Sequence, residues 1–534
     1  MKAKKILTSV LMCGFLSAPL MNVSAANSDT NTTTKYSLKF NSNNYTEETA
    51  TVDGKTITYR AYEKIVYVKN PVDTKYEIMN IYVPEEYYEG TSIGSYNADT
   101  APIFFPNTVG GYMPAEPGSP GLDERSGEPN AALVALSKGY VVAEPGARGR
   151  TTQNESGEYT GKAPAAIVDL KAAVRYLRYN DKIMPGDAEK IISNGTSAGG
   201  ALSALLGATG NSKDYDSYLK KLGAANERDD IFAVSSYAAI TDLDHADMAY
   251  EWLFNGINDY KKLVISSDTD YHIQREMVEG TLTEDQIQVS NELSALFPNY
   301  VNSLKLTDSN GTPLTLNKNG NGTFKEYVKS FVMDSAQKAL DSGTDLSSLT
   351  WITIKDGKVT NLDFDQYVQY VGRMKTPSAF DGLDLTNAEN ELFGTSTTKA
   401  QHFTQYSLEN STVSSTLADA SLIKMMNPLY YIGAKGTTTS SYWRIRQGTV
   451  DNDTSLAVPT LLSAKLENSG FNVDFSMPWD QSHGGDYDLD ELFEWTDNIV
   501  ASSKDSPSSN SKKRATNTSN NGKDSNVNKN AKSS

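Results

Sequence analysis

Two short segments of this 534-residue chain carry the pattern Gly-x-Ser-x-Gly, which holds a nucleophilic serine on a tight turn. They are GTSAGG, which contains Ser197, and GTSIG, which contains Ser92. Ser197 follows the apolar segment EKIIS and precedes the helix-forming segment ALSALLGA, whereas Ser92 has loop-like sequence on both sides. The nucleophile needs the strand–turn–helix setting, because the glycines let strand and helix approach closely. We therefore predict that Ser197 is the nucleophile and that Ser92 is a turn residue.

A serine nucleophile also needs a general base, an orienting acid and donors for the oxyanion. Of the four histidines, His483 lies in PWDQSHGGDYD, directly after the last expected strand, and is the predicted base. The acid is Asp451 or Asp453 in TVDND, and the first position after the preceding strand favours Asp451. The expected oxyanion donors are the Ala198 amide and an amide of Gly110 or Gly111 in PNTVGGY.

The elements that must position these residues alternate between strands and helices. Apolar, β-branched and aromatic runs predict strands, and 3.6-residue periodicity or helix-forming composition predicts helices. The alternation indicates a mostly parallel sheet covered on both faces, and the order Ser, Asp, His indicates an α/β-hydrolase fold. The expected strands are 56–68, 77–84, 101–105, 140–146, 189–193, 231–240, 442–448 and 472–477, and the expected helices are 131–139, 162–180, 201–208, 457–468 and 488–500.

Residues 241–420 interrupt this pattern and predict a large inserted cap, or lid, domain. A helix is expected at 324–340 and a hairpin at 351–364, with Asp356-Gly357 at its turn and much polar loop around them. Residues 35–240 and 421–500 would then form the two parts of the hydrolase domain. Since open α/β sheets bind ligands at their carboxyl edge, the cap is expected to cover that edge and to control substrate selectivity.

The two ends of the chain differ from its body. Residues 1–26 read as a secretory signal peptide and contain the only cysteine, Cys13, so a secreted protein without disulfides is expected, either free or associated with the cell surface. The tail 501–534 is basic, and we expect it to be disordered, either in weak contact with anionic cell-wall polymer or without function. Residues 27–500 carry a net charge of about −25, which excludes nucleic acid and anionic membrane surfaces as natural partners.

No metal or cofactor is expected. Asp486, Asp488 and Asp490 alternate as carboxylates do in calcium loops, but the glycine and glutamate of such a loop are missing. A cluster of acidic residues at the start of the helix at 488–500 explains them better. No two histidines have the spacing of metal ligands.

Three segments together resemble the bacterial tannases, which are tannin acyl hydrolases of the α/β-hydrolase superfamily. They are NGTSAGGALSALLGATGNSKDY, RIRQGTVDNDTSLAVP and PWDQSHGGDYDLDELFEW, and the likeness covers roughly residues 35–500. The resemblance implies a triad of Ser197, Asp451 and His483. It also implies that Lys375, Glu389 and Asp453 bind the hydroxyls of a galloyl ring.

The resulting hypothesis is a secreted serine esterase that cleaves galloyl ester and depside bonds of hydrolysable tannins and releases gallic acid, with a small phenolic ester as its partner. A broader carboxylesterase acting on feruloyl or small acyl esters is the nearest alternative. A non-catalytic surface-binding protein on a hydrolase fold belongs to another class, and the intact set of Ser197, Asp451 and His483 argues against it. A serine peptidase of this fold fits less well, since no propeller repeat precedes the hydrolase region.

Overall fold

The strands that carry the expected site residues lie side by side in one sheet. The computed structural model describes residues 36–123, 126–267 and 273–504. Its sheet has the order β1-β2-β3-β5-β4-β6-β7-β12-β13. The strands are β1 (Thr46–Val52), β2 (Lys55–Val66), β3 (Ile78–Pro84), β4 (Pro102–Pro106), β5 (Val141–Pro145), β6 (Asp187–Thr196), β7 (Ala233–Tyr237), β12 (Tyr442–Arg446) and β13 (Asn472–Ser476).

The sheet changes from antiparallel to parallel pairing at β5. β1, β2, β3 and β5 pair antiparallel, and every pair from β5 through β13 is parallel. All five residues of β4, β5 and β7 are buried, as continuous apolar runs covered on both faces require. The carboxyl ends of the parallel strands therefore meet along one edge, which confirms the predicted α/β fold.

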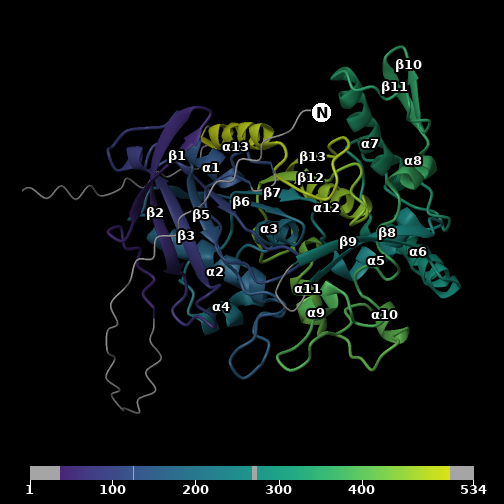
Figure 1. Ribbon diagram of the computed structural model, residues 1–534, viewed down its shortest axis with the longest axis horizontal. Coiled ribbons are helices and arrows are strands. Elements are labelled where there is room, and N and C mark those ends of the chain that lie inside the picture. The colour runs from purple at the N-terminus through teal and green to yellow at the C-terminus, as the bar shows by residue number, and fades with distance from the viewer. Residues whose placement is uncertain (1–35, 124–125, 268–272, 505–534) are drawn as a thin grey trace, which may run out of the picture. The chain divides into compact units, whose positions relative to one another are not determined.

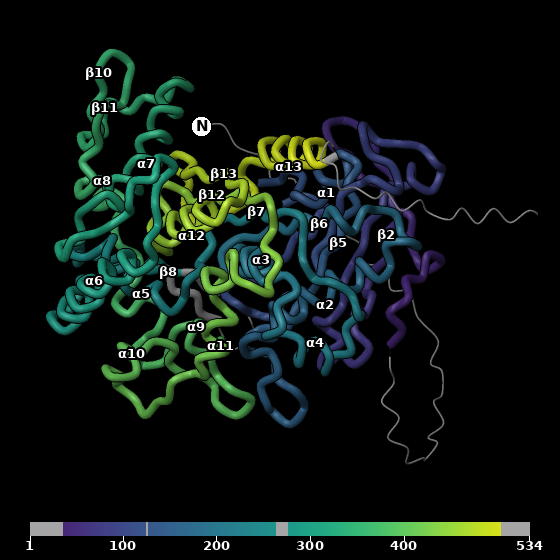
Figure 2. Tube along the Cα trace, turned by 180° about the vertical axis from the view of Figure 1, so that it is seen from behind, coloured from purple at the N-terminus to yellow at the C-terminus, as the bar shows by residue number. Residues whose placement is uncertain are grey.

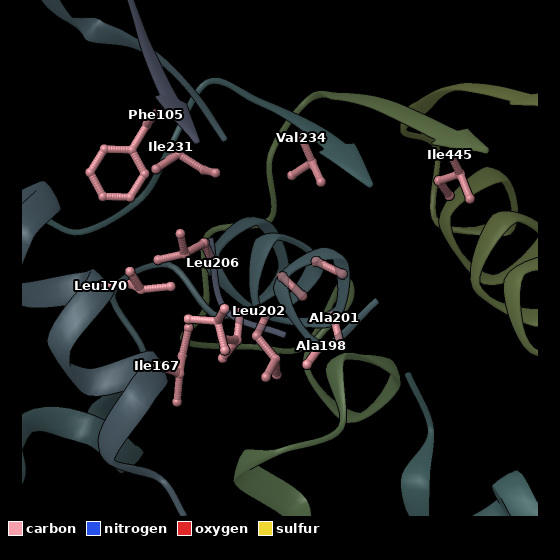
Figure 3. Close-up of a cluster of buried hydrophobic side chains, with 14 of the residues drawn as sticks. Phe105, Ile167, Leu170, Ala198, Ala201, Leu202, Leu206, Ile231, Val234 and Ile445 are labelled. Carbon is pink, nitrogen blue, oxygen red and sulfur yellow. The ribbon is translucent and has the colours of Figure 1, made fainter. Parts of the chain in front are cut away.

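Helices cover both faces of this sheet. In β4 the side chains of Phe104 and Phe105 point to opposite faces, as successive residues of a strand must. The Phe104 ring lies 5.3 Å from that of Phe493 in α13 (Leu489–Lys504), while Phe105 belongs to the cluster around α2 (Ala165–Asn180) and α3 (Ala198–Ala208) that Figure 3 shows. The other helices outside the cap are α1 (Ala131–Ser137), α4 (Asp216–Leu222) and α12 (Ala457–Asn468).

The chain between β7 and β12 forms the inserted elements, which Figures 1 and 2 show in teal and green on one side of the sheet. They belong to the same compact unit as the sheet. The predicted boundaries 241 and 420 remain predictions. The elements are α5 (Leu243–Phe254), β8 (Asp259–Ser267), β9 (Ile273–Thr281), α6 (Glu284–Leu304), α7 (Thr323–Asp341), β10 (Ile352–Lys355), β11 (Lys358–Leu362), α8 (Phe364–Val371), α9 (Ala388–Leu392), α10 (Gln405–Glu409) and α11 (Ala420–Met425).

Helix α7 and the β10–β11 hairpin confirm two predicted elements of the cap, and the described stretches 305–322, 342–351, 372–387 and 393–404 contain no helix or strand, in agreement with the expected loop. Asp356 and Gly357 both have positive φ at the hairpin turn, at 49° and 72°. The 21-residue helix α6 begins with a capping box, in which Thr283 accepts from the Gln286 amide and the Gln286 side chain accepts from the Thr283 amide. That Thr-x-x-Gln pattern was a readable start signal for a helix.

The two ends of the chain were predicted to be a signal peptide and a disordered tail. The signal peptide and most of the basic tail lie outside the described residues, and α13 continues to Lys504, four residues into the tail predicted as disordered. Asp490 lies in the first turn of α13, as expected. Asp488 directly precedes that turn, where its carbonyl accepts from the Leu492 amide and its carboxylate pairs with Arg444 in β12. Asp486 lies outside the helix start and accepts a hydrogen bond from Asn194 in β6.

A buried ion pair inside the cap joins α5 to the segment that leads to Lys375. Arg373 and Glu251 of α5 are each at most 1% exposed, and the two form a double hydrogen bond. Arg373 also donates to the carbonyls of Phe254 and Lys375, while Ser290 of α6 donates to Glu251. The pair therefore fixes two helices and the backbone of Lys375 to one another.

Replacing Arg373 with Met should destabilise the protein by about 3–5 kcal/mol, because Glu251 would be left as a buried carboxylate without its cation. Urea unfolding would measure the loss. The matched control is Lys75→Met, which removes a cation whose pair with Glu116 is 58% and 62% exposed and which should therefore change the urea midpoint little. Equal midpoints for the two variants would contradict this role of Arg373.

Candidate active site

Ser197 sits at a sharp turn between β6 and α3, with backbone angles φ 60° and ψ −123°. A positive φ is costly for a residue with a side chain and persists only where surrounding contacts enforce it. Here the Ser197 amide donates to the Tyr237 carbonyl at 2.9 Å. A Cβ at Gly195 would lie 2.4 Å from the Gly199 carbonyl oxygen, and one at Gly200 would lie 2.5 Å from that of Tyr237. Both glycines are thus required by close backbone approach.

The second Gly-x-Ser-x-Gly match has none of these features. Ser92 is exposed and lies in the loop between the short helix Glu85–Tyr87 and β4. This placement agrees with its interpretation as a turn residue.

His483 and Asp451 meet beside the carboxyl ends of β12 and β13. His483 Nδ1 lies 2.9 Å from Asp451 Oδ2, and Asp451 is 1% exposed. Asp451 also accepts from the Gln447 amide group at 2.7 Å and from the Asp453 backbone amide at 2.9 Å. The carboxylate is therefore held at both oxygens. Its bond to Nδ1 favours the imidazole tautomer that leaves Nε2 free to accept a proton.

The surroundings of His483 favour its protonated form. Burial opposes the charge, but the hydrogen bond and the negative charge of Asp451, together with the charge of Asp453, outweigh burial and raise the pKa of His483. Such a shift strengthens the imidazole as a base.

The loop that carries His483 is attached directly to β6, which ends just before Ser197, and to the neighbouring strand β7. Gly485 lies so close to β6 that a Cβ there would be 2.0 Å from Thr196 Oγ1. Asn194 donates to Asp486 at 2.9 Å, and Tyr237 donates to Asp488 at 2.6 Å. Gly485 therefore allows the loop to approach the sheet, whereas a Cβ at Gly484 would have open space around it.

The predicted oxyanion donors flank the Ser197 turn. Ala198 is the first residue of α3, so its amide has no acceptor within the helix. The loop after β4 carries Gly110 and Gly111, and Gly111 has φ 53°. Asn107 fastens this loop to the turn, because its side-chain amide donates to the carbonyls of Asn194 and Gly199.

The three residues implied to bind a ring form a charged group next to His483. Lys375 Nζ lies 3.1 Å from Asp453 Oδ2 and 4.1 Å from the centre of the Phe380 ring, and His483 Nε2 lies 3.9 Å from the same Asp453 oxygen. Burial opposes ionisation of Asp453, but the charges of Lys375 and His483 lower its pKa. Burial raises the pKa of Glu389, while Lys375 acts against that rise. Lys375 of the cap thus contacts Asp453 in the loop after β12, and the charge of Glu389 interacts with both.

Sequence reasoning missed two residues of this region. Gln447 at the end of β12 is fully buried and holds Asp451, and Arg150 follows β5 and contacts both the loop after β4 and the cap. Both follow strands of the parallel sheet: Gln447 comes directly after β12, and Arg150 comes five residues after β5. The rule that carboxyl ends of such strands converge could have identified them.

A group of potential metal ligands, Asp242, Asp244 and His245, lies at the start of α5. Its carboxylates accept hydrogen bonds from protein groups: Tyr300 donates to Asp242, Tyr430 to Asp244, and Asn427 to both. Its geometry is explained by this network, which ties the cap to the segment before β12.

A parallel sheet whose successive carboxyl ends carry a serine turn, a buried aspartate and a histidine, with a cap inserted before the aspartate, defines an α/β-hydrolase. The sequence model of the BD-FAE family matches residues 124–279. No curated protein sequence matched the chain.

Solved structures match nearly the whole described chain. The tannase of Fusobacterium nucleatum is 55% identical, with a TM-score of 0.83 over 87% of this chain and 100% of that one. The tannase of Lactobacillus plantarum is 46% identical, with a TM-score of 0.84 and the same coverage. A tannin acyl hydrolase in complex with ethyl gallate is 46% identical, with a TM-score of 0.81 over 87% of this chain and 99% of that one. This chain belongs to the bacterial tannase family.

Imidazole NMR should show His483 titrating above the ordinary histidine pKa of about 6.5. Asp451→Asn should lower the pKa of His483, because it removes the negative charge beside Nδ1. His483→Gln assigns the signal among four histidines. His245 can be compared with His483 in the same spectra. Burial opposes the charge of His245, but Asp242 and Asp244 outweigh burial and raise its pKa to about 10. A His483 pKa that does not respond to Asp451→Asn would contradict the pairing.

Proposed function

We propose that this protein is a secreted serine esterase that hydrolyses galloyl esters, including the depside bonds of hydrolysable tannins, and releases gallic acid. Ser197, His483 and Asp451 are its catalytic triad. Ala198 and Gly110 or Gly111 supply the oxyanion donors, and Lys375, Glu389 and Asp453 bind the hydroxyls of the galloyl ring.

The observation that carries this proposal is the meeting of two sets of residues at His483. Asp451 holds one ring nitrogen, and Asp453, paired with Lys375, lies beside the other. A planar acid with several hydroxyls suits such a site, since phenolic hydroxyls donate to carboxylates and an ammonium donates to a phenolic oxygen. Relatives of this chain have been solved with ethyl gallate and with 3,4-dihydroxybenzoate, which supports this choice of acyl group.

In the first half of the reaction, Ser197 Oγ attacks the ester carbonyl carbon as His483 Nε2 takes the hydroxyl proton. The oxyanion forms beside the Ala198 amide and the loop after β4. When the C–O bond to the alcohol breaks, His483 returns the proton to the leaving oxygen. The galloyl group remains as an ester on Ser197.

In the second half, water takes the place of the alcohol. His483 removes a proton from water, the resulting hydroxide attacks the galloyl carbonyl, and the proton passes to Ser197 Oγ as gallic acid leaves. Asp451 orients the imidazole and stabilises its positive charge in both halves, which agrees with the raised pKa of His483.

Secretion rests on the amino-terminal sequence, with Lys2, Lys4 and Lys5 before an apolar run and a small-residue cleavage site near residue 26. In the described part of the chain, no helix is long and apolar enough to cross a membrane. Weak contact of the basic tail with anionic cell-wall polymer is an additional proposal. Its residues from 505 onward lie outside the described ranges.

Ser197→Ala should reduce kcat for methyl gallate by at least about 10⁴-fold, because no other group can form the acyl-enzyme. Liquid chromatography of released gallic acid measures this loss, with Ser92→Ala as the matched control that should keep full activity. Undiminished turnover by Ser197→Ala, or loss of activity in Ser92→Ala, would overturn the assignment. If wild type cleaves methyl ferulate as well as methyl gallate, the broader esterase alternative is correct.

Glu389→Gln should reduce kcat/KM for methyl gallate by about 10- to 100-fold, since a hydrogen bond to a charged group contributes roughly 1.5–3 kcal/mol. The loss should be much smaller for p-nitrophenyl acetate, which has no ring hydroxyls in its acyl group. Glu326→Gln alters an exposed cap carboxylate and is the matched control. Equal losses of kcat/KM on both esters would show that Glu389 does not bind the ring hydroxyls.

A further inference from the structure

Arg150 lies where the hydrolase sheet, the loop after β4 and the cap come together. It follows β5 by five residues, and 18% of its side chain is exposed. Its Nε donates to the Gly111 carbonyl at 2.9 Å, and its terminal nitrogen forms an ion pair with Glu391 of α9. Gly111 belongs to the candidate oxyanion loop, and Glu391 is two residues from Glu389. One guanidinium therefore joins the candidate oxyanion loop to the helix that carries Glu389.

The backbone beneath Arg150 is rigidly held. The Arg150 amide donates to the Tyr112 carbonyl at 2.8 Å, and a Cβ at Gly149 would lie 2.1 Å from the Pro114 nitrogen. The neighbouring Arg148 is buried and forms a two-point ion pair with Asp169 in α2. Arg150 thus extends from a fixed base rather than from a loose loop, and its planar group can join two partners in one geometry.

The negative charge of Glu389, one of the proposed ring-binding residues, acts on Arg150 and on its neighbour Tyr112. Burial lowers the pKa of Arg150, and the negative charge of Glu389 acts against that change. Tyr112 is 2% exposed, and its hydroxyl has no hydrogen-bond partner among the described residues. Burial and then the charge of Glu389 raise its pKa. Arg150 and Tyr112, both outside the implied ring-binding set, therefore lie within the electrostatic reach of Glu389.

We propose that Arg150 is a positioning residue that couples the oxyanion loop to helix α9, so that the ring-binding residue Glu389 and the oxyanion amides keep one fixed separation. The inference rests on the proposed function, because it concerns the same site. The carbonyl carbon and the ring hydroxyls of a galloyl ester are rigidly connected through the aromatic ring. Both ends of the site must therefore stay at a matching distance for the carbonyl to reach Ser197, and a small misplacement costs rate rather than binding alone.

The experiment compares Arg150→Met with Lys399→Met. Lys399 is the other cation on Glu391, at 2.9 Å, but its side chain is 70% exposed and it does not contact the oxyanion loop. Arg150→Met should lower kcat for methyl gallate by about 10- to 100-fold with a smaller change in KM. Lys399→Met should change kcat less than about twofold, because exposed ion pairs contribute little. Arg150→Lys keeps the charge but not the two-point contact, so it should recover only part of the loss.

A double-mutant cycle separates coupling from simple loss of structure. If Arg150 acts through α9, Arg150→Met combined with Glu391→Gln should be little worse than Arg150→Met alone. Circular dichroism and the thermal midpoint confirm that each variant is folded. Additive losses, or an Arg150→Met variant no slower than Lys399→Met, would overturn the coupling. A wild-type enzyme that does not cleave methyl gallate would instead overturn the proposed function; the same variants on p-nitrophenyl acetate would then still report whether Arg150 supports the oxyanion loop.

Discussion

The close approach of β6 and α3 at Ser197 is the constraint on which the rest of this structure depends. The turn can form only because Gly195, Gly199 and Gly200 have no side chains where the backbones meet, and because the Tyr237 carbonyl accepts from Ser197. The positive φ of Ser197 lifts its side chain out of the sheet edge. The loops after β4 and β13 are then placed against this turn by Asn107, Asn194 and Gly485.

The same edge explains the distribution of buried charge. Asp451 can remain a carboxylate in the interior because Gln447, His483 and a backbone amide all donate to it. Asp453, two residues later, faces Lys375 instead. A loop of three residues therefore divides its two acids between the His483 imidazole and Lys375 of the cap. In the proposed function, this division lets one strand end serve both catalysis and recognition.

A few buried or half-buried contacts hold the segments of the cap that lie near the candidate site. Arg373 and Glu251 fix the backbone of Lys375 from inside the cap, and Arg150 joins α9 to the loop after β4. Asn427 and Tyr300 tie the start of α5 to its neighbours through Asp242. Since these contacts involve charged groups shielded from water, they resist small displacements more strongly than exposed ion pairs would. The backbone of Lys375 and helix α9 are thus held by contacts of the cap, without being part of the sheet.

Local sequence was sufficient to predict the strands of the central sheet and the strand–turn–helix setting of Ser197. The runs that became β4, β5, β6, β7, β12 and β13 are short, apolar and separated by amphipathic helices, and glycine spacing distinguishes GTSAGG from GTSIG by its flanking segments. The position of His483 also followed from chain order. In the cap, local pattern was less informative: α5 buries the charged residues Asp247 and Glu251, and Glu251 and Arg373 look like surface residues until they pair.

The sequence by itself therefore determined the parallel sheet, the serine turn and the order of the groups that follow it. Only the tertiary structure decided which aspartate holds His483, where Lys375 and Glu389 meet Asp453, and that Gln447 and Arg150 belong to the site. The physical reason is that strands and turns are specified by neighbours in the chain, whereas the partner of a charged side chain is chosen by distance in the folded molecule. Asp453 and Lys375, 78 residues apart, become neighbours only after the cap has packed against the sheet.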